Sequence, residues 1–182
     1  MMKLASILTA CALCCTVNAP WSATICRPSG LPSQRPCAVA SATPTPTAEA
    51  TAPVAEASMD AYARAVVEMT NEERAKQGLD ALVVDADAVA AAQLRAAELA
   101  QSFSHTRPNG ESCFTALDEV GAVYSGAGEN IARGQMTAER VMASWMSSPG
   151  HYANIMRESY TRIGVAHVVI DGVHLWVQLF LR

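Results

Sequence analysis

The sequence predicts an α/β protein, specifically a three-layer α/β/α sandwich that ends in an antiparallel hairpin and follows a disordered linker. Three observations lead to this prediction. Segments with helical periodicity fill the middle of the chain, two segments rich in β-branched and aromatic residues close it, and those two segments are largely apolar on both faces. A sheet that is apolar on both faces needs helices on each side.

The composition fits one folded domain in a chain of 182 residues, of which 51% are hydrophobic and 16% charged. The formal net charge is −4, and the lysines and arginines form no basic cluster. Binding to nucleic acid depends on clustered Lys and Arg that neutralise phosphates. The composition therefore excludes nucleic acid as an expected partner.

Residues 1–23 have the character of a signal peptide or lipoprotein signal, because Lys3 precedes an uncharged apolar stretch over residues 4–17. That stretch is shorter than the roughly 20 residues that a transmembrane helix requires. Leu8-Thr9-Ala10 precedes Cys11 as in a bacterial lipobox, which predicts lipidation of Cys11. The alternative is ordinary cleavage between residues 19 and 23. Either route predicts an extracytoplasmic protein, lipid-anchored or periplasmic in the cell envelope, or secreted.

Residues 24–58 are expected to form a flexible linker, because Pro, Ala and Thr dominate residues 38–58 and aromatic residues are absent there. Cys26 and Cys37 lie in this region and could pair with each other in an oxidising compartment. The folded domain is expected to span residues 59–182. Cys113 is then left in that domain as a free thiol.

Four helices are expected in the first part of the domain. Residues 59–77 repeat apolar side chains at helical spacing, and an alanine-rich helix follows Asp85 or Asp87, either of which can cap it, and runs to about residue 101. A short helix is expected over residues 114–120, and Thr137 can cap a fourth that ends before Pro149. Arg74 in the first helix is expected to be buried through pairing with an acidic residue of the second.

The end of the chain predicts two strands, at residues 161–170 and 173–181, joined by Asp171-Gly172. This dipeptide favours a type I′ turn and therefore a two-residue hairpin. That hairpin predicts four facing pairs: Val168 with Leu175, Ala166 with Val177, His167 with Trp176, and Val169 with His174. Trp145 and Trp176 are expected in the core.

Three segments carry side chains that packing alone does not require. Residues 103–106 contain His105 before a Pro-Asn-Gly turn, residues 128–132 contain Glu129 between a glycine and an apolar strand-like stretch, and residues 145–155 contain His151 at the start of a helical turn. Taken alone, each of these residues could equally be a satisfied structural side chain.

These segments, with several others in the same order, resemble the CAP superfamily, which unites cysteine-rich secretory proteins, antigen 5 and plant pathogenesis-related proteins. The matching stretches are residues 71–74 with 78–79, 103–105, 128–132, 145–155, 160–165 and 176–178. They extend over the whole expected domain. The resemblance implies the same α/β/α sandwich that the periodicity predicts.

The resemblance also implies a cleft lined by two histidines and two acidic residues. His105, Glu129 and His151 match three of these four positions, while Ser148 stands where the second acid lies in animal and plant members. We expect the ligand-binding set to comprise those three residues with Ser148 and Asn130. The missing carboxylate predicts weaker metal binding than in members with all four groups.

Two neutral imidazoles and one carboxylate suit Zn²⁺ or another divalent metal with open coordination positions, so His105, Glu129 and His151 are the expected metal ligands. His167 and His174 are expected on a partly exposed face outside this site. Ser104, Ser148 and Cys113 lack the sequence context of a nucleophile, and we expect them to cap and pack.

The sequence thus predicts a cleft-type module of the envelope or secreted fraction that binds a metal, a small molecule, an envelope component or a protein partner. The alternative is a metal-dependent hydrolase or peptidase that acts on envelope material. A third hypothesis, lipid or sterol binding as in some eukaryotic relatives, requires an apolar groove. The residue pattern does not decide whether the domain is an enzyme.

Overall fold

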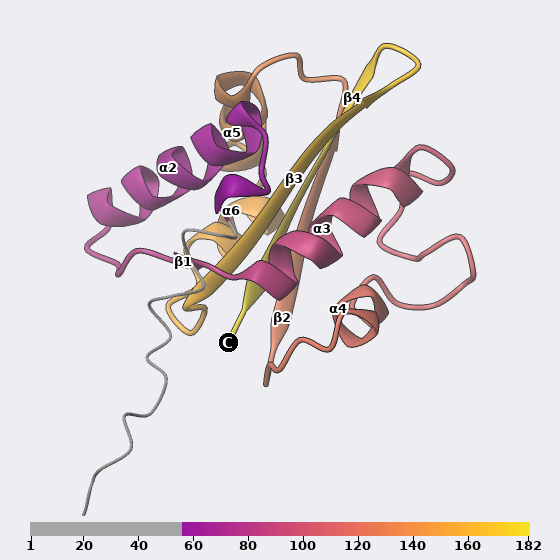
Figure 1. The fold of residues 1–182 in the computed structure, drawn as a ribbon. Helices are drawn as coiled ribbons and strands as arrows, with labels where there is room; N and C mark the ends of the chain where they lie inside the picture. The colour runs from indigo at the N-terminus through magenta and orange to yellow at the C-terminus, as the bar shows by residue number, and fades with distance from the viewer. Residues whose placement is uncertain (1–55) are drawn as a thin grey trace, which may run out of the picture. The chain divides into compact units, whose positions relative to one another are not determined.

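The computed structural model describes residues 56–182. Lipidation of Cys11, pairing of Cys26 with Cys37, and the signal and nearly all of the linker concern residues outside this range. Within it, four strands form one sheet in the order β1-β3-β4-β2. Helices α2, α5 and α6 cover one face, and α3 and α4 cover the other, so the three-layer α/β/α sandwich is confirmed (Figure 1).

The bounds of the elements follow the sequence expectations closely. The helices are α2 (Ala61–Lys76), α3 (Ala86–Leu99), α4 (Thr115–Glu119), α5 (Ala138–Met146) and α6 (Pro149–Ile155). The strands are β1 (Val83–Val84), β2 (Ala127–Arg133), β3 (Arg162–Ile170) and β4 (Val173–Leu181). The sequence gives no sign of β1, because a two-residue strand has no periodicity. It pairs in parallel with β3 at the sheet edge.

Side-chain caps begin three of the helices. Asp60 accepts a hydrogen bond from the backbone nitrogen of Ala63 at 2.7 Å and so caps α2. Asp85 does the same for α3 at 2.9 Å, which decides between the two candidate caps. Thr137 caps α5 as predicted. Each cap satisfies a backbone donor that the first turn of a helix leaves unpaired.

The C-terminal hairpin has the predicted register. Its partners include Val168 with Leu175, Ala166 with Val177, His167 with Trp176, and Val169 with His174. The turn residues Asp171 and Gly172 have φ angles of 50° and 74°, the positive values that a type I′ turn requires. The central strand β4 pairs with β3 on one side and with β2 on the other.

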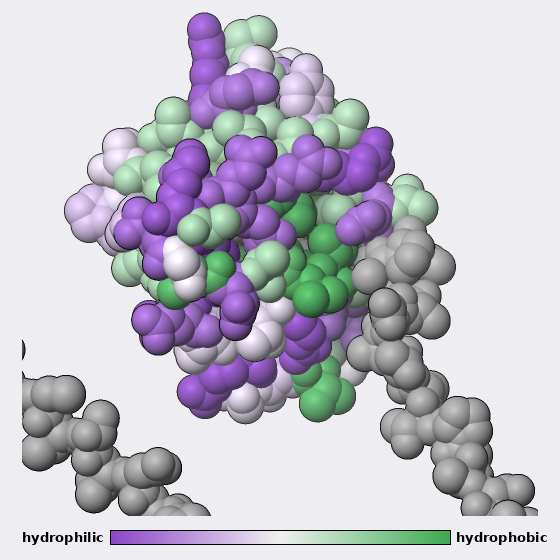
Figure 2. Space-filling model, turned by 90° about the vertical axis from the view of Figure 1, so that its left-hand side faces the viewer, coloured by the Kyte–Doolittle hydropathy of each residue, from purple (hydrophilic) through white to green (hydrophobic). Residues whose placement is uncertain are grey.

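Each face of the sheet has its own hydrophobic core. Trp145 and Trp176 lie buried between the sheet and the α2/α5 layer, which confirms them as core residues. Leu99, Leu117 and Leu179 belong to the cluster on the α3 side. Figure 2 shows the side of the molecule on which α2 lies, where hydrophilic side chains cover much of the surface.

The alanine-rich sequence of α3 allows it to lie very close to β3. A Cβ atom added to Gly164 would come within 2.1 Å of the backbone carbonyl carbon of Ala88, so only glycine fits there. This close approach fixes α3 on the sheet. It matters for function because α3 carries the arginine that holds the candidate site.

Arg74 is buried as expected, but the prediction of an acidic partner on the second helix is wrong. Its guanidinium donates hydrogen bonds to the backbone carbonyls of Asp80, Ile155 and Arg157. Helix α3 cannot supply a partner because it lies on the opposite face of the sheet. Arg74 instead anchors the segment between α6 and β3, and burial lowers its pKa.

Candidate functional site

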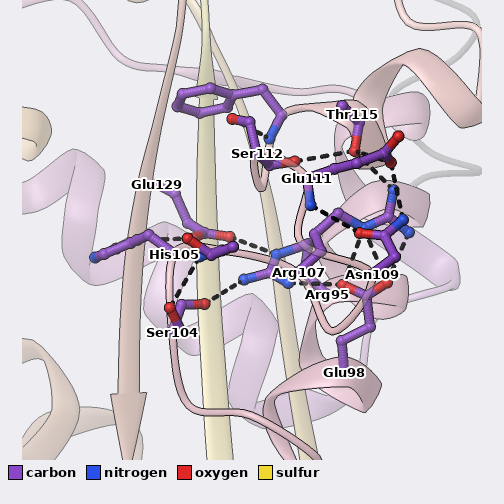
Figure 3. Close-up of polar contacts among 12 residues, drawn as sticks. Arg95, Glu98, Ser104, His105, Arg107, Asn109, Glu111, Ser112, Thr115 and Glu129 are labelled. Carbon is purple, nitrogen blue, oxygen red and sulfur yellow. Dashed lines mark hydrogen bonds and ion pairs between the residues drawn. The ribbon is translucent and has the colours of Figure 1, made fainter.

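Glu129 is the centre of the candidate site. It lies on β2, its side chain is 1% exposed, and both carboxylate oxygens are engaged. Oε1 lies 2.7 Å from Nδ1 of His105, and Oε2 accepts from Nε of Arg95 at 2.9 Å. Figure 3 shows Glu129 between these two side chains. A buried carboxylate requires such partners because desolvation would otherwise favour its neutral form.

A network of charged side chains behind Glu129 fixes the loop that carries His105. Arg95, on α3, also donates to a carboxylate oxygen of Glu98 at 2.6 Å and to the backbone oxygen of Ser104 at 2.7 Å (Figure 3). Arg107 bridges Glu98 and Glu119. Burial acts to lower the pKa of Arg95, but the hydrogen bonds and charges of its glutamate partners outweigh burial and raise it. Hydrogen bonds to Glu98 and Glu119 raise the pKa of Arg107 as well, so both arginines stay charged.

The contact with Glu129 determines which nitrogen of His105 faces outward. An ionised carboxylate can only accept, so Nδ1 of His105 carries the hydrogen and donates it. In the neutral ring the other nitrogen, Nε2, is then an acceptor without a partner among residues 56–182, and the side chain is 57% exposed. A carboxylate that holds the inner nitrogen of a histidine while the outer one is free is the usual arrangement around a metal-binding imidazole.

His151 lies on α6, near this pair but not in hydrogen-bonding contact with it. Burial first, and the nearby His105 second, lower the pKa of His151, so its ring is neutral at pH 7. Its Nδ1 atom is buried and has no hydrogen-bond partner among residues 56–182. This agrees with the neutral imidazole expected for a metal ligand, and burial is the principal cause.

A cleft of about 460 Å³ opens beside Glu129. It is lined by His105, Ser112, Cys113, Phe114, Ala127, Gly128, Glu129, Asn154, Arg157 and Tyr160. Of the expected trio, His105 and Glu129 line it, while the side chain of His151 is not part of the wall. Sequence reasoning missed Asn154, Arg157 and Tyr160. Asn154 and Tyr160 lie within the stretches that resemble the CAP superfamily, whereas nothing in the sequence marks Arg157.

The comparison with known families gives one decisive match. The model of the cysteine-rich secretory protein family, CAP, matches residues 67–180, well over half of the chain. The chain belongs to the CAP family. The match includes both elements that carry the His105–Glu129 pair and the helix that carries His151.

Individual relatives agree with this assignment. The uncharacterized protein YkwD of Bacillus subtilis is 40% identical over 129 residues, which is 70% of this chain and 49% of YkwD. The chain therefore spans about half the length of this curated relative. An extracellular Bacillus anthracis protein with an SCP domain has a similar fold, with a TM-score of 0.63 and 24% identity over 78% of this chain and 45% of that chain.

A second structure with a similar fold was solved with zinc. NaASP2 with Zn²⁺ has a TM-score of 0.51 and 16% identity, over 67% of this chain and 80% of that chain. At this identity the comparison shows a shared fold only.

Among residues 56–182, no helix is long and apolar enough to cross a membrane.

Besides His151, two other residues expected in the CAP cleft lie outside its wall. Asn130 is completely buried, and its Nδ2 donates to the backbone oxygen of His151 at 3.2 Å and to Oε1 of Gln178 at 3.1 Å. Asn154 donates to Oδ1 of Asn130 at 2.9 Å. Asn130 thus ties α6 to β2 and positions His151 relative to Glu129. Ser148 is the half-buried N-cap residue of α6, and its side chain makes no capping bond.

Cys113 is the unexpected member of the site. It is a free, buried thiol, as predicted, but the loop returns it beside His105. One ligand atom each of His105, Cys113 and Glu129 lie within 4.8 Å of one another. Burial, and then the charge of Glu129, raise the pKa of Cys113 to about 12. The thiol is therefore protonated at neutral pH, and it becomes a thiolate ligand only if a metal displaces the proton.

His167 and His174 lie away from this cleft, as expected. Nδ1 of His167 is 2.7 Å from Oδ2 of Asp60, and its Nε2 is 2.9 Å from Nδ1 of His174. The side chain of His167 is only 4% exposed, which is less than a partly exposed face implies. The rings of Tyr62 and Trp176 pack against it.

Proposed function

We propose that this CAP domain is an extracytoplasmic binding module whose cleft holds a divalent metal ion, with Zn²⁺ as the first candidate. The observation that carries the proposal is the contact of Glu129 with Nδ1 of His105, which leaves Nε2 of His105 free beside the cleft. A metal supplies a Lewis acid that can bind an oxygen or nitrogen atom of a ligand.

The residues present fit such an ion. His151 has a buried nitrogen with no partner among residues 56–182 and a lowered pKa, both of which suit a neutral imidazole ligand. Glu129 acts here as the group that orients His105, because Arg95 and His105 already occupy its oxygens. Cys113, which lies beside His105 and Glu129, is the alternative to His151 as the partner ligand of His105. The zinc present in the structure of NaASP2 is consistent with this choice of metal.

Isothermal titration with Zn²⁺ tests the proposal. The unaltered protein should release heat, and His105→Ala should abolish it. His151→Ala should weaken binding, because His151 lies near the cleft but outside its wall. Glu129→Gln should weaken binding by roughly 10–100-fold, the usual effect of removing an orienting partner. His174→Ala is the matched control and should bind as the unaltered protein does. Equal heats in all variants would mean that the ion does not bind at these residues, and metal binding in this cleft would be ruled out.

We favour binding over hydrolysis because the cysteine in the cleft is a poor nucleophile, with its pKa raised to about 12. A hydrolase that acts on envelope material would require an activated nucleophile or a metal-bound water. Turnover of such material that a chelator inhibits and that Glu129→Gln abolishes would replace the binding proposal with the enzymatic one.

We propose the same extracytoplasmic location for this chain as for the Bacillus anthracis relative, whose structure is described as an extracellular protein. The apolar stretch after Lys3 and the lipobox before Cys11 support this location. Mass spectrometry of the mature N-terminus tests it: a diacylglyceryl group on Cys11 would establish the lipid anchor, and a free N-terminus between residues 19 and 23 would establish cleavage.

A further inference from the structure

One wall of the cleft carries a guanidinium that has no acidic partner. Arg157 lines the cleft, and its Cζ atom lies 5.4 Å from the centre of the Tyr160 ring. Within residues 56–182, the guanidinium makes this ring contact and no ion pair or hydrogen bond. Its backbone is fixed, because the carbonyl of Arg157 accepts a hydrogen bond from buried Arg74 at 3.1 Å.

The hydroxyl of Tyr160 is a second group without a partner in the described part of the chain. The residue is only 6% exposed, and its ring stacks on buried Phe180 with centroids 5.6 Å apart. Its hydroxyl lies where a Cβ atom on Gly128 would come within 2.5 Å, so the glycine keeps this space open. A rigid ring thus presents an O–H donor beside Arg157 in the cleft wall.

The balance of charge at the cleft favours an anion. Glu129 is the acidic residue that lines it, and Arg95 and His105 already contact its two oxygens. Glu158, next to Arg157 in sequence, lines a different pocket, beside Arg74 and Asp80. Arg157 and Tyr160 therefore line the cleft without a competing free carboxylate in its wall.

From these observations we infer that the cleft recognises a ligand that bears an oxyanion, either a carboxylate or a phosphate, through the Arg157 guanidinium and the Tyr160 hydroxyl. A guanidinium binds such groups with two parallel hydrogen bonds, and charge-assisted bonds are the stronger kind. This inference rests on the proposed function in that it takes the cleft to be a ligand site. It requires no metal.

The test is a chemical-shift titration of the full chain by NMR, in EDTA, with inorganic phosphate and with N-acetylglycine as probes. N-acetylglycinamide serves as the neutral control and should not bind. Arg157→Gln should weaken binding of the oxyanion about tenfold or more, Arg157→Lys should recover part of the loss, and Tyr160→Phe should weaken it severalfold. Arg140→Gln, at an exposed arginine of α5, is the matched control and should bind normally.

The outcomes separate this inference from the metal proposal. Binding of phosphate alone or of N-acetylglycine alone supports the inference and identifies the group that is recognised. If neither probe binds, or if Arg157→Gln binds both as tightly as the unaltered protein does, the inference is overturned. Arg157→Gln should keep the Zn²⁺ heat, and His105→Ala should lose that heat but still bind the oxyanion in EDTA. Loss of metal binding therefore leaves the oxyanion result unaffected.

Discussion

Two histidines of this domain make the same contact with a carboxylate but differ in exposure and in the surroundings of their second ring nitrogen. Nδ1 of His105 and Nδ1 of His167 each lie 2.7 Å from a carboxylate oxygen, of Glu129 and of Asp60 respectively. The side chain of His105 is 57% exposed and lines a cleft, whereas that of His167 is 4% exposed and its Nε2 contacts His174. A histidine–carboxylate pair is thus no sign of a site by itself. What distinguishes the two is access to the second nitrogen.

Removing the positive charge of Arg95, which contacts Glu129, should have the largest effect on stability. Arg95→Leu removes the buried cationic partner of Glu129 and leaves that carboxylate with His105 and the Cys113 thiol. We expect a loss of about 3–5 kcal/mol in the free energy of unfolding, because a buried charge without its partner is strongly destabilising. Urea unfolding measures this loss. Arg140→Leu, at an exposed position of α5, should change stability by under about 0.5 kcal/mol. A loss below about 1 kcal/mol for Arg95→Leu would mean that buried Glu129 does not depend on Arg95 for its stability in the fold.

Removing each histidine tests the comparison directly. His167→Ala should cost about 2–3 kcal/mol, because a buried ring and its hydrogen bonds are lost and the contact with Trp176 disappears. His105→Ala removes a more exposed ring and should cost under about 1 kcal/mol. Zinc binding should respond in the opposite way, with loss only in His105→Ala. Equal losses of stability in urea, or loss of the zinc heat in His167→Ala, would contradict the distinction between a structural His167 and a metal-binding His105.

The open space of the cleft depends on Gly128. In Gly128→Ala the new Cβ would press on the Tyr160 hydroxyl, and the stacked Phe180 limits how far that ring can move. We expect a loss of about 1–2 kcal/mol from overpacking. In the background of Tyr160→Phe, which has no hydroxyl, the same substitution should cost less. Urea unfolding of the four proteins in this cycle gives the coupling, and simple additivity would contradict the proposed clash.

The fold was largely predictable because local rules determine most of it. The alternation of apolar residues and the Asp171-Gly172 turn specify the register of the hairpin, and the caps Asp60, Asp85 and Thr137 mark where helices begin. These signals act over a few residues. The strand β1 escaped prediction because two residues are too few to show a period.

The site was predictable only in part, because its contacts join distant segments. His105 and Glu129 came from the CAP resemblance, and no local pattern indicates that a loop returns Cys113 to them. The position of Arg157 in the cleft depends on the segment that Arg74 anchors through backbone carbonyls. Every residue has a carbonyl, so a sequence cannot reveal which one an arginine will bind.

The smallest expected effect is a dependence of stability on pH that comes from His151. Its pKa is lowered in the folded protein, by burial first and then by His105, from the ordinary value of 6.5. The unfolded chain therefore binds a proton more readily than the folded one as the pH falls through 6.5, and protonation favours unfolding. The contribution of His151 should be fully present above that value and should decline below it.

Urea unfolding at pH 5 and pH 7, in EDTA, measures this difference. His151→Gln should lose less stability between the two pH values than the unaltered protein, by about 1 kcal/mol or less, since one pKa unit corresponds to about 1.4 kcal/mol. His174→Gln supplies the matched control for removing one histidine elsewhere. If His151→Gln shows the same fall in stability as the unaltered protein, its ring titrates normally, and the buried nitrogen cannot mark it as the neutral ligand near the cleft.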